Sequence, residues 1–335
     1  MPHPLFDKHR ATLERALTAI AERSYWSAFP ESASPKVYGE GAAESGKAAF
    51  DALRGQPFTR GGAGAGPHPT QVGRERSPFG FDLGITYPRQ DLDALFARVA
   101  AAQVQWRKAG PEAWVGVSIE ILTRLNQQSF LIANSVMHTT GQAFMMAFQA
   151  AGPHAQDRGL EAVAYAWDQM RRVPASAQWE KPQGKHEPIR MQKHFRVVPR
   201  GVSLVIGCCT FPTWNGYPGM FASLATGNAV IVKPHPGAIL PLAISVGIAR
   251  DVLAEAGFDP DVVTLVAHEA GDDTAQALAL RPEVKLIDFT GIPANGEWLE
   301  RNAHHATVFT EKAGDNQVIV GSTADLPGHA RNLAF

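Results

Sequence analysis

The sequence predicts an α/β protein with a Rossmann-like, doubly wound parallel sheet. From Val197 onward, short runs of Val, Ile and Leu alternate with helical segments. Such strands are typical of a parallel sheet that helices cover on both faces, and right-handed crossovers wind them into one sheet. The predicted strands are residues 202–207, 228–233, 262–266, 284–289, 307–311 and 316–320, and helices are expected near 216–225, 239–256, 272–280 and 296–303.

The amino-terminal half is predicted to be helical. Residues 7–23 place Leu13, Leu17 and Ile20 at helical spacing, which indicates an amphipathic helix. Further segments are rich in Ala and Leu and poor in β-branched residues, as helices are. These segments are residues 90–108, 112–138, 142–150 and 157–172.

A stretch rich in Gly and Pro spans residues 55–79 and includes G-G-A-G-A-G-P at 61–67. It lacks the third glycine of G-x-G-x-x-G, follows no predicted strand and precedes no predicted helix. We therefore interpret it as a surface loop and not as a phosphate-binding loop. Residues 1–84 are predicted to form an N-terminal helical extension that contains this loop.

Composition excludes several classes of partner. The 335 residues carry a formal net charge of -1, which gives no electrostatic reason to expect nucleic acid or an anionic membrane. No run of the chain approaches the ~20 apolar residues of a membrane span. The two cysteines, Cys208 and Cys209, are neighbours, so a strained vicinal bond is the one disulfide they could form within the chain. We expect a cytoplasmic protein.

Residues that could bind a ligand or take part in catalysis follow four of the predicted strands. Because the carboxyl ends of parallel strands meet at one edge of a sheet, these residues are expected to lie together. Taken singly, each has a structural explanation: a solvated turn lysine, a turn glycine, a surface carboxylate. Their shared location favours a functional site. The residues are Cys208, Cys209 and Thr210, then Lys233 and His235, then Thr290 and Gly291, and finally Glu311.

Five ordered motifs carry a resemblance to a known family. They are P-R-G-V-S-L-V-I-G (199–207), L-A-T-G-N-A-V-I-V-K-P (224–234), E-A-G-F-D-P-D-V-V (255–263), F-T-G (289–291) and F-T-E-K-A-G (309–314). From about residue 85 to its end, the chain resembles the aldehyde dehydrogenase superfamily. T-F-P-T-W-N and K-P-H-P resemble the phenylacetate-degradation branch, which oxidises a semialdehyde formed after aromatic ring opening.

This resemblance implies a domain plan. Residues 85–306 would form the cofactor-binding domain, and residues 307–335 would begin an incomplete catalytic domain. Residues 173–198 resemble the hairpin through which the family assembles, so a homo-oligomer is expected. The implied reaction is oxidation of a small-molecule aldehyde to a carboxylic acid with NAD or NADP.

The resemblance also implies roles for single residues. Lys233 would reach the adenosine ribose, with His235 beside it, and Glu311 would be the general base that activates a thiol or water. The loop beside the cofactor would consist of Phe289, Thr290, Gly291 and Gly296, and Gly296 is expected to open a helix. No metal ligands are expected.

Two positions depart from the family pattern. Cys208, Cys209 and Thr210 stand where Pro-Trp-Asn is usual, so Thr210 becomes a possible oxyanion donor and Asn215 an alternative. Such donors contribute ~3–4 kcal/mol. Pro236 stands where NAD-using members carry a glutamate, and loss of that carboxylate predicts a preference for NADP(H) over NAD(H).

The two cysteines lie in the donor loop, where a small buried thiol is usually inert filling. The family's nucleophilic cysteine follows its glutamate by a few tens of residues, whereas only 24 residues (335 − 311) follow Glu311 here. Pro327 resembles the start of a helix that contains Phe335. We therefore expect that the chain stops before its nucleophile and does not oxidise aldehydes.

Two alternatives remain. One is a reductase that acts on CoA-linked acyl groups with the same fold; Glu311 counts against it, because a water-activating base suits hydrolysis. The other is a nucleotide-binding or assembly subunit without catalytic activity, which the missing nucleophile would favour.

Overall fold

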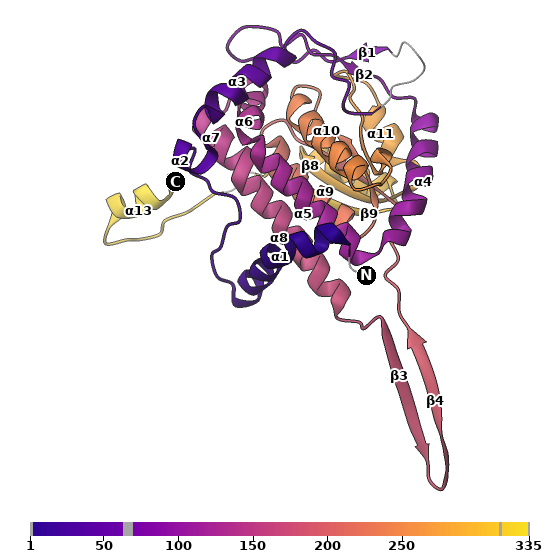
Figure 1. Cartoon of the computed structure of the whole chain (residues 1–335). Helices are drawn as coiled ribbons and strands as arrows, with labels where there is room; N and C mark the ends of the chain where they lie inside the picture. The colour runs from indigo at the N-terminus through magenta and orange to yellow at the C-terminus, as the bar shows by residue number, and fades with distance from the viewer. Residues whose placement is uncertain (1–2, 63–69, 315–316, 334–335) are drawn as a thin grey trace.

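A computed structural model of the chain describes residues 3–62, 70–314 and 317–333 and has a parallel β-sheet at its centre (Figure 1). The sheet has five strands in the order β7-β6-β5-β8-β9, all parallel. The predicted fold class is therefore confirmed. The strands are β5 (Val202–Ile206), β6 (Ala229–Lys233), β7 (Val263–Leu265), β8 (Val284–Gly291) and β9 (Thr307–Lys312).

Helices cover both faces of this sheet. Val205 packs into a core with the helices that follow β5 and β6, whereas Leu204 and Ile206 face a second core on the opposite side. Alternate strand residues point to opposite faces, so both faces are apolar. The first core contains α9 (Pro212–Ala225) and α10 (Leu240–Glu255), and the second contains α4 (Leu92–Ala109), α11 (Thr274–Ala279) and α12 (Pro293–Asn302).

The strand predicted at 316–320 is wrong for residues 317–320, which form no strand; residue 316 lies outside the described residues. Val318 and Ile319 are exposed, so these apolar side chains cover no face of the sheet. The edge strand is instead β9, with Phe309 more than half exposed (56%). Further along the chain, α13 (Leu326–Leu333) confirms the helix expected near Pro327 and stands apart from the sheet (Figure 1). Phe335, which was expected in the same helix, lies outside the described residues.

The helical first half is confirmed with two changes. The predicted helix 112–138 is broken at Gln128, whose φ of -107° and ψ of 16° leave the helical region. The helices predicted at 142–150 and 157–172 are joined by a π-helical turn that contains Pro153. The elements are α5 (Pro111–Gln127), α6 (Ser129–Thr140), α7 (Phe144–Gln149), η1 (Ala150–His154) and α8 (Ala155–Arg171).

The N-terminal extension packs onto the same core. Phe6, Leu13 and Phe50 are all buried there. The predicted first helix is present as α1, and two helices that the sequence did not predict follow it. The Gly-rich stretch 61–67 lies mostly outside the described residues, but part of the longer loop pairs as a two-stranded sheet. The elements are α1 (Pro4–Glu22), α2 (Pro35–Tyr38), α3 (Ala42–Leu53), β1 (Gln71–Val72) and β2 (Tyr87–Pro88).

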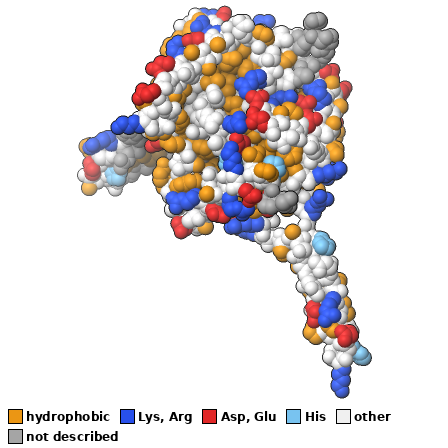
Figure 2. All heavy atoms as spheres, viewed as in Figure 1, with side chains coloured by type: hydrophobic (Ala, Val, Ile, Leu, Met, Phe, Trp, Pro, Cys, Tyr) orange, Lys and Arg blue, Asp and Glu red, His pale blue; other side chains and the backbone are white. Residues whose placement is uncertain are grey.

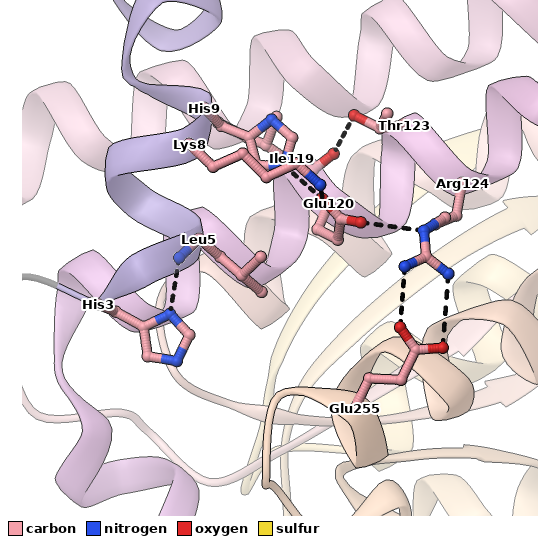
Figure 3. A network of polar contacts seen from close by, with 9 residues as sticks. All are labelled: His3, Leu5, Lys8, His9, Ile119, Glu120, Thr123, Arg124 and Glu255. Atoms are coloured by element: carbon pink, nitrogen blue, oxygen red, sulfur yellow. Dashed lines mark hydrogen bonds and ion pairs between the residues drawn. The ribbon is translucent and has the colours of Figure 1, made fainter.

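A polar network ties the extension to the rest of the molecule (Figure 3). Glu120 of α5 accepts hydrogen bonds from Lys8 at 2.5 Å and His9 at 2.7 Å, both on α1. Arg124, one turn further along α5, contacts Glu120 at 3.0 Å and Glu255 at the end of α10 at 2.8 Å. The network therefore connects three helices from different parts of the chain.

A β-hairpin projects away from this body as a narrow arm (Figures 1 and 2). It consists of β3 (Ser176–Gln183) and β4 (His186–His194), which pair antiparallel with each other alone among the described strands.

A short 3-10 turn, η2 (Pro260–Val262), precedes β7. No helix within the described ranges is long and apolar enough to cross a membrane.

Candidate functional site

The strand order reverses between β5 and β8. The chain winds from β5 towards β7 on one side and from β8 to β9 on the other. At such a point the loops that leave two neighbouring strands run in opposite directions. A crevice therefore forms at the carboxyl edge of the sheet. A pocket of about 530 Å³ lies at this edge, lined by residues that end or follow β5, β6, β8 and β9.

Most of the predicted site residues meet in this pocket. Its lining includes Thr210, Lys233, His235, Phe289, Thr290, Gly291 and Glu311. Four loops that are distant in sequence therefore open onto one space, as expected for parallel strands. Thr290 pairs in register with Glu311 across β8 and β9, which places the F-T-G loop beside the carboxylate.

Gly296 is the exception. It lies behind the pocket wall, and α12 begins at Pro293 instead, because proline's fixed φ suits the first helical position. The expectation that Gly296 opens the helix was therefore wrong. A Cβ at Gly296 would lie 2.8 Å from Lys312 Cδ and 3.3 Å from Phe289 Cε1. The glycine leaves room for the Phe289 ring that forms the pocket wall.

Lys233 ends β6 and is almost completely buried, with 6% of its surface exposed. Burial lowers its pKa to about 8, and Asp272 partly opposes that effect. No hydrogen bond or ion pair reaches its ammonium group from the part of the chain that the structure describes. A buried cation without a partner is unfavourable unless a ligand supplies one. Lys233 therefore fits a ligand with hydroxyl or phosphate oxygens.

A side chamber of about 220 Å³ adjoins the main pocket, and Lys233, His235 and Phe289 line both. Its other wall contains His268 and Asp272, which follow β7. Burial, then Lys233 and then His268 lower the pKa of His235.

Two residues of the side chamber, His268 and Asp272, were not among those expected from sequence. Both follow the third predicted strand, whose carboxyl end reads A-H-E-A-G-D-D at 267–273. Because ligands bind at the carboxyl ends of parallel strands, this segment is the sequence signal that points to them.

Glu311 is connected to the start of α9. Asn215 Nδ2 donates to Glu311 Oε1 at 2.9 Å, and Asn215 Oδ1 accepts a weak hydrogen bond from Cys208 Sγ at 3.6 Å. Lys312, next to Glu311, turns the other way and contacts both carboxylate oxygens of Glu300 at 3.0 Å. The Asn215 amide, considered from sequence as an oxyanion donor, is thus hydrogen-bonded to the carboxylate in this structure.

The cysteines and Thr210 form the loop after β5. Both thiols are free; Cys208 is buried, and burial raises the pKa of Cys209, with smaller effects of Cys208 and Glu75. A raised pKa disfavours the reactive thiolate. Thr210 is exposed; its hydroxyl is 3.8 Å from Cys208 Sγ, and its carbonyl accepts from Gln142 at 2.6 Å.

This fold and pocket define a class: α/β proteins that hold a ligand at the switch point of a doubly wound sheet. The chain belongs to the aldehyde dehydrogenase family, because the model of the "Aldehyde dehydrogenase family" matches residues 86–335. That match covers the sheet and the helices around it.

Individual proteins of the family resemble the chain to different degrees. A crystal structure of an NAD-dependent aldehyde dehydrogenase from Burkholderia multivorans is 66% identical with a TM-score of 0.96 and covers 100% of this chain and 60% of its own. N-succinylglutamate 5-semialdehyde dehydrogenase of Burkholderia lata is 25% identical over 79% of this chain and 51% of its own length. 2-Aminomuconic semialdehyde dehydrogenase of Danio rerio is 34% identical over 38% of this chain and 26% of its own length. The chain thus spans about half the length of the Burkholderia lata protein.

Proposed function

We propose that this chain carries the cofactor-binding part of an enzyme that oxidises an aldehyde to a carboxylic acid with a nicotinamide dinucleotide. The observation that carries the proposal is the pocket that brings the buried Lys233, the F-T-G loop and Glu311 together. When bound there, the dinucleotide would accept a hydride from the substrate. The domain plan is part of the proposal: residues 85–306 bind the cofactor, and residues 307–335 begin the catalytic domain.

The residues of the pocket receive separate roles. Lys233 and His235 bind the adenosine end, because a buried cation attracts phosphate and hydroxyl oxygens. Phe289, Thr290 and Gly291 form the wall beside the nicotinamide end. Glu311 acts as the general base.

Asn215 orients the Glu311 carboxylate through its 2.9 Å hydrogen bond. Thr210 donates to the developing oxyanion, since its hydroxyl lies on the exposed rim of the pocket.

Two cofactors have a specific observation in their favour. Pro236 lacks the carboxylate that would repel a 2′-phosphate, and Lys233 supplies a nearby cation, which supports NADP. The similar protein from Burkholderia multivorans is named an NAD-dependent enzyme, which supports NAD. Both fit a side chamber walled by Lys233.

For the substrate we propose a semialdehyde of phenylacetate degradation, on the strength of T-F-P-T-W-N (210–215) and K-P-H-P (233–236). A CoA-linked acyl substrate stays an alternative, and a base placed like Glu311 favours hydrolysis over it. We also propose a homo-oligomer assembled through the β3–β4 hairpin. We also propose a cytoplasmic location, because a reducing compartment keeps the two adjacent thiols free of a disulfide.

Calorimetric titration of the chain with NAD and NADP tests the binding part of this proposal. We expect at least one of them to bind, and Lys233→Met to weaken that binding by ~10-fold or more, as loss of a charge-assisted contact would. Lys312→Met is the matched control: it removes a pocket lysine that already contacts Glu300 and should leave affinity nearly unchanged. Equal affinities of wild type and Lys233→Met would contradict the assignment.

A turnover assay tests the cysteines. Cys208 is buried against Asn215, and burial disfavours the Cys209 thiolate, so we expect neither to act as the nucleophile. The chain should bind cofactor and yet oxidise no aldehyde. Cofactor-dependent oxidation by this chain that disappears in Cys208→Ser or Cys209→Ser would show that one of them is the nucleophile.

A further inference from the structure

The side chamber contains a buried imidazole nitrogen that lacks a partner among the described residues. His268 is 6% exposed, and its Nδ1 lies 3.0 Å from Asp272 Oδ1 and 2.9 Å from the main-chain oxygen of Glu269. Both neighbours are acceptors, so Nδ1 carries a proton and donates. Nε2 is buried and has no hydrogen-bond partner in the described part of the chain. A buried polar atom in this state is costly, which favours a ligand atom as its partner.

Because Nδ1 always carries its proton, Nε2 has two well-defined states. In the neutral ring Nε2 is an acceptor, and in the charged ring it is a donor. One position can therefore accept a hydrogen bond from a hydroxyl or donate one to a phosphate. The hydrogen bonds to Asp272 and Glu269 fix the ring orientation in both states.

The position of His268 relates this nitrogen to the adenosine end of the proposed cofactor. His268 lines the same chamber of about 220 Å³ as Lys233 and His235, which also line the main pocket. Lys233 is close enough to influence the protonation of His268. A ribose held by Lys233 would thus lie beside Nε2.

We propose that His268 is a specificity-determining residue that reads the 2′ position of the adenosine ribose. Its Nε2 accepts a hydrogen bond from the 2′-hydroxyl of NAD when the ring is neutral and donates one to the 2′-phosphate of NADP when the ring is protonated. The choice between the two cofactors then depends on pH. This inference rests on the proposed function, since it requires a dinucleotide in the pocket.

The charges around His268 set the direction of that dependence. Burial and then Lys233 lower the pKa of His268, while Asp272 and the hydrogen bonds of Nδ1 raise it in part, so the free ring is neutral near pH 7 and suits NAD. A phosphate dianion beside it would raise the pKa, so falling pH favours NADP and its binding takes up a proton. Other charged or titratable groups on this side are His235 after β6 and Glu269 in the same loop, which pairs with Arg74 at 3.6 Å. Arg89 pairs with Asp272 at 3.2 Å.

The experiment is calorimetric titration of the 335-residue chain with NAD and with NADP between about pH 5.5 and 8.5. For wild type we expect the ratio of the two dissociation constants to move towards NADP by ~10-fold as pH falls, which corresponds to a rise of about one unit in the pKa of one group on binding. In His268→Gln the ratio should not move this way, because protonation of the phosphate itself then favours NAD at low pH. His186→Gln, on the projecting β3–β4 hairpin, is the control that removes a histidine outside the chamber, and it should keep the wild-type trend.

Two further measurements protect the test against a misfolded variant. Titration in buffers of different ionisation enthalpy counts protons, and wild type should take up more protons with NADP than with NAD near pH 6.5. Asp272→Asn removes the carboxylate that supports the charged ring, so the change of preference should occur at lower pH.

A ratio with the same pH dependence in wild type and His268→Gln, or equal proton uptake with both cofactors, would overturn the assignment of His268 while leaving cofactor binding in place. Failure of wild type to bind either dinucleotide at any pH would instead overturn the proposed function, and this inference with it.

Discussion

At the scale of single residues, the main feature of the site is a charged side chain, Lys233, that is almost completely buried. Lys233 is 6% exposed, and burial lowers its pKa from 10.5 to about 8. The folded chain therefore holds this ammonium at a cost, which a bound anion or hydroxyl would offset. A group that is unfavourable in the free protein and useful with a ligand is typical of a functional site.

This cost predicts that Lys233→Met stabilises the free protein. The lowered pKa corresponds to at most ~3 kcal/mol, so the free energy of unfolding at pH 7 should rise by up to that amount. Between about pH 8 and 10.5 the unfolded state binds more protons than the folded state, so wild-type stability rises there and the difference from the variant shrinks. Denaturant unfolding at pH 7 and 9.5 measures both effects.

The matched control for stability is Lys312→Met, whose ammonium already pairs with Glu300 at 3.0 Å. It should not stabilise the protein, because no buried, unpaired charge is removed. If Lys233→Met were less stable than wild type at pH 7, the Lys233 ammonium would have a partner that offsets its burial.

At the scale of elements, the N-terminal extension supports the helix that follows the Lys233 loop. Glu75 is 2% exposed, and its Oε1 accepts hydrogen bonds from the amides of Ile239 at 2.6 Å and Leu240 at 2.9 Å, at the start of α10. Its Oε2 accepts from the Tyr87 hydroxyl at 2.5 Å. The first amides of a helix have no partner within it, and no side chain of α10's own N-cap residue supplies one. Glu75 caps α10 from a distant part of the chain.

Glu75→Ala should therefore destabilise the protein by ~2–4 kcal/mol, because it leaves two buried amides and a buried hydroxyl without partners. Glu75→Gln keeps an acceptor oxygen and should cost much less. Thermal and denaturant unfolding of the two variants give the comparison, and Tyr87→Phe measures the phenol's share. Wild-type stability in Glu75→Ala would mean that water or another group satisfies these amides.

At the scale of the whole molecule, the β3–β4 hairpin has the features of a surface for self-association. It stands away from the body (Figure 1), and Trp179, Ile189 and Met191 on it are 37%, 44% and 46% exposed. An isolated two-stranded hairpin is marginally stable in water, and its outer edges offer unpaired backbone groups. Contact with a second copy of the chain would stabilise the hairpin and give its unpaired backbone groups partners.

Replacing the hairpin (residues 176–194) with a short Gly-Ser linker should reduce the molar mass measured by light scattering and leave cofactor affinity unchanged, because the pocket lies at the sheet edge. Trp179→Ala is a milder variant and should weaken association without changing the fold. An unchanged molar mass after replacement, or a monomeric wild type, would refute assembly through the hairpin.

Local sequence patterns were enough to specify the parallel sheet and the place of the pocket. Runs of Val, Ile and Leu mark β5, β6 and β8, and the rule that ligands bind at strand ends located Lys233, the F-T-G loop and Glu311. The same local reasoning placed Gly296 at a helix start that Pro293 takes. It also predicted a strand at residues 316–320, because a local pattern does not show whether a neighbouring strand is available for pairing.

The contacts that join elements far apart in the chain come from tertiary packing. Asn215 contacts Glu311 across 96 residues, and Glu75 caps α10 across 164. The buried Nε2 of His268, without a partner in the described part of the chain, is likewise visible only when β6 and β7 lie side by side. Local pattern cannot give these pairs, because it fixes which face of an element is buried, whereas the packing of all elements together fixes which side chains then meet.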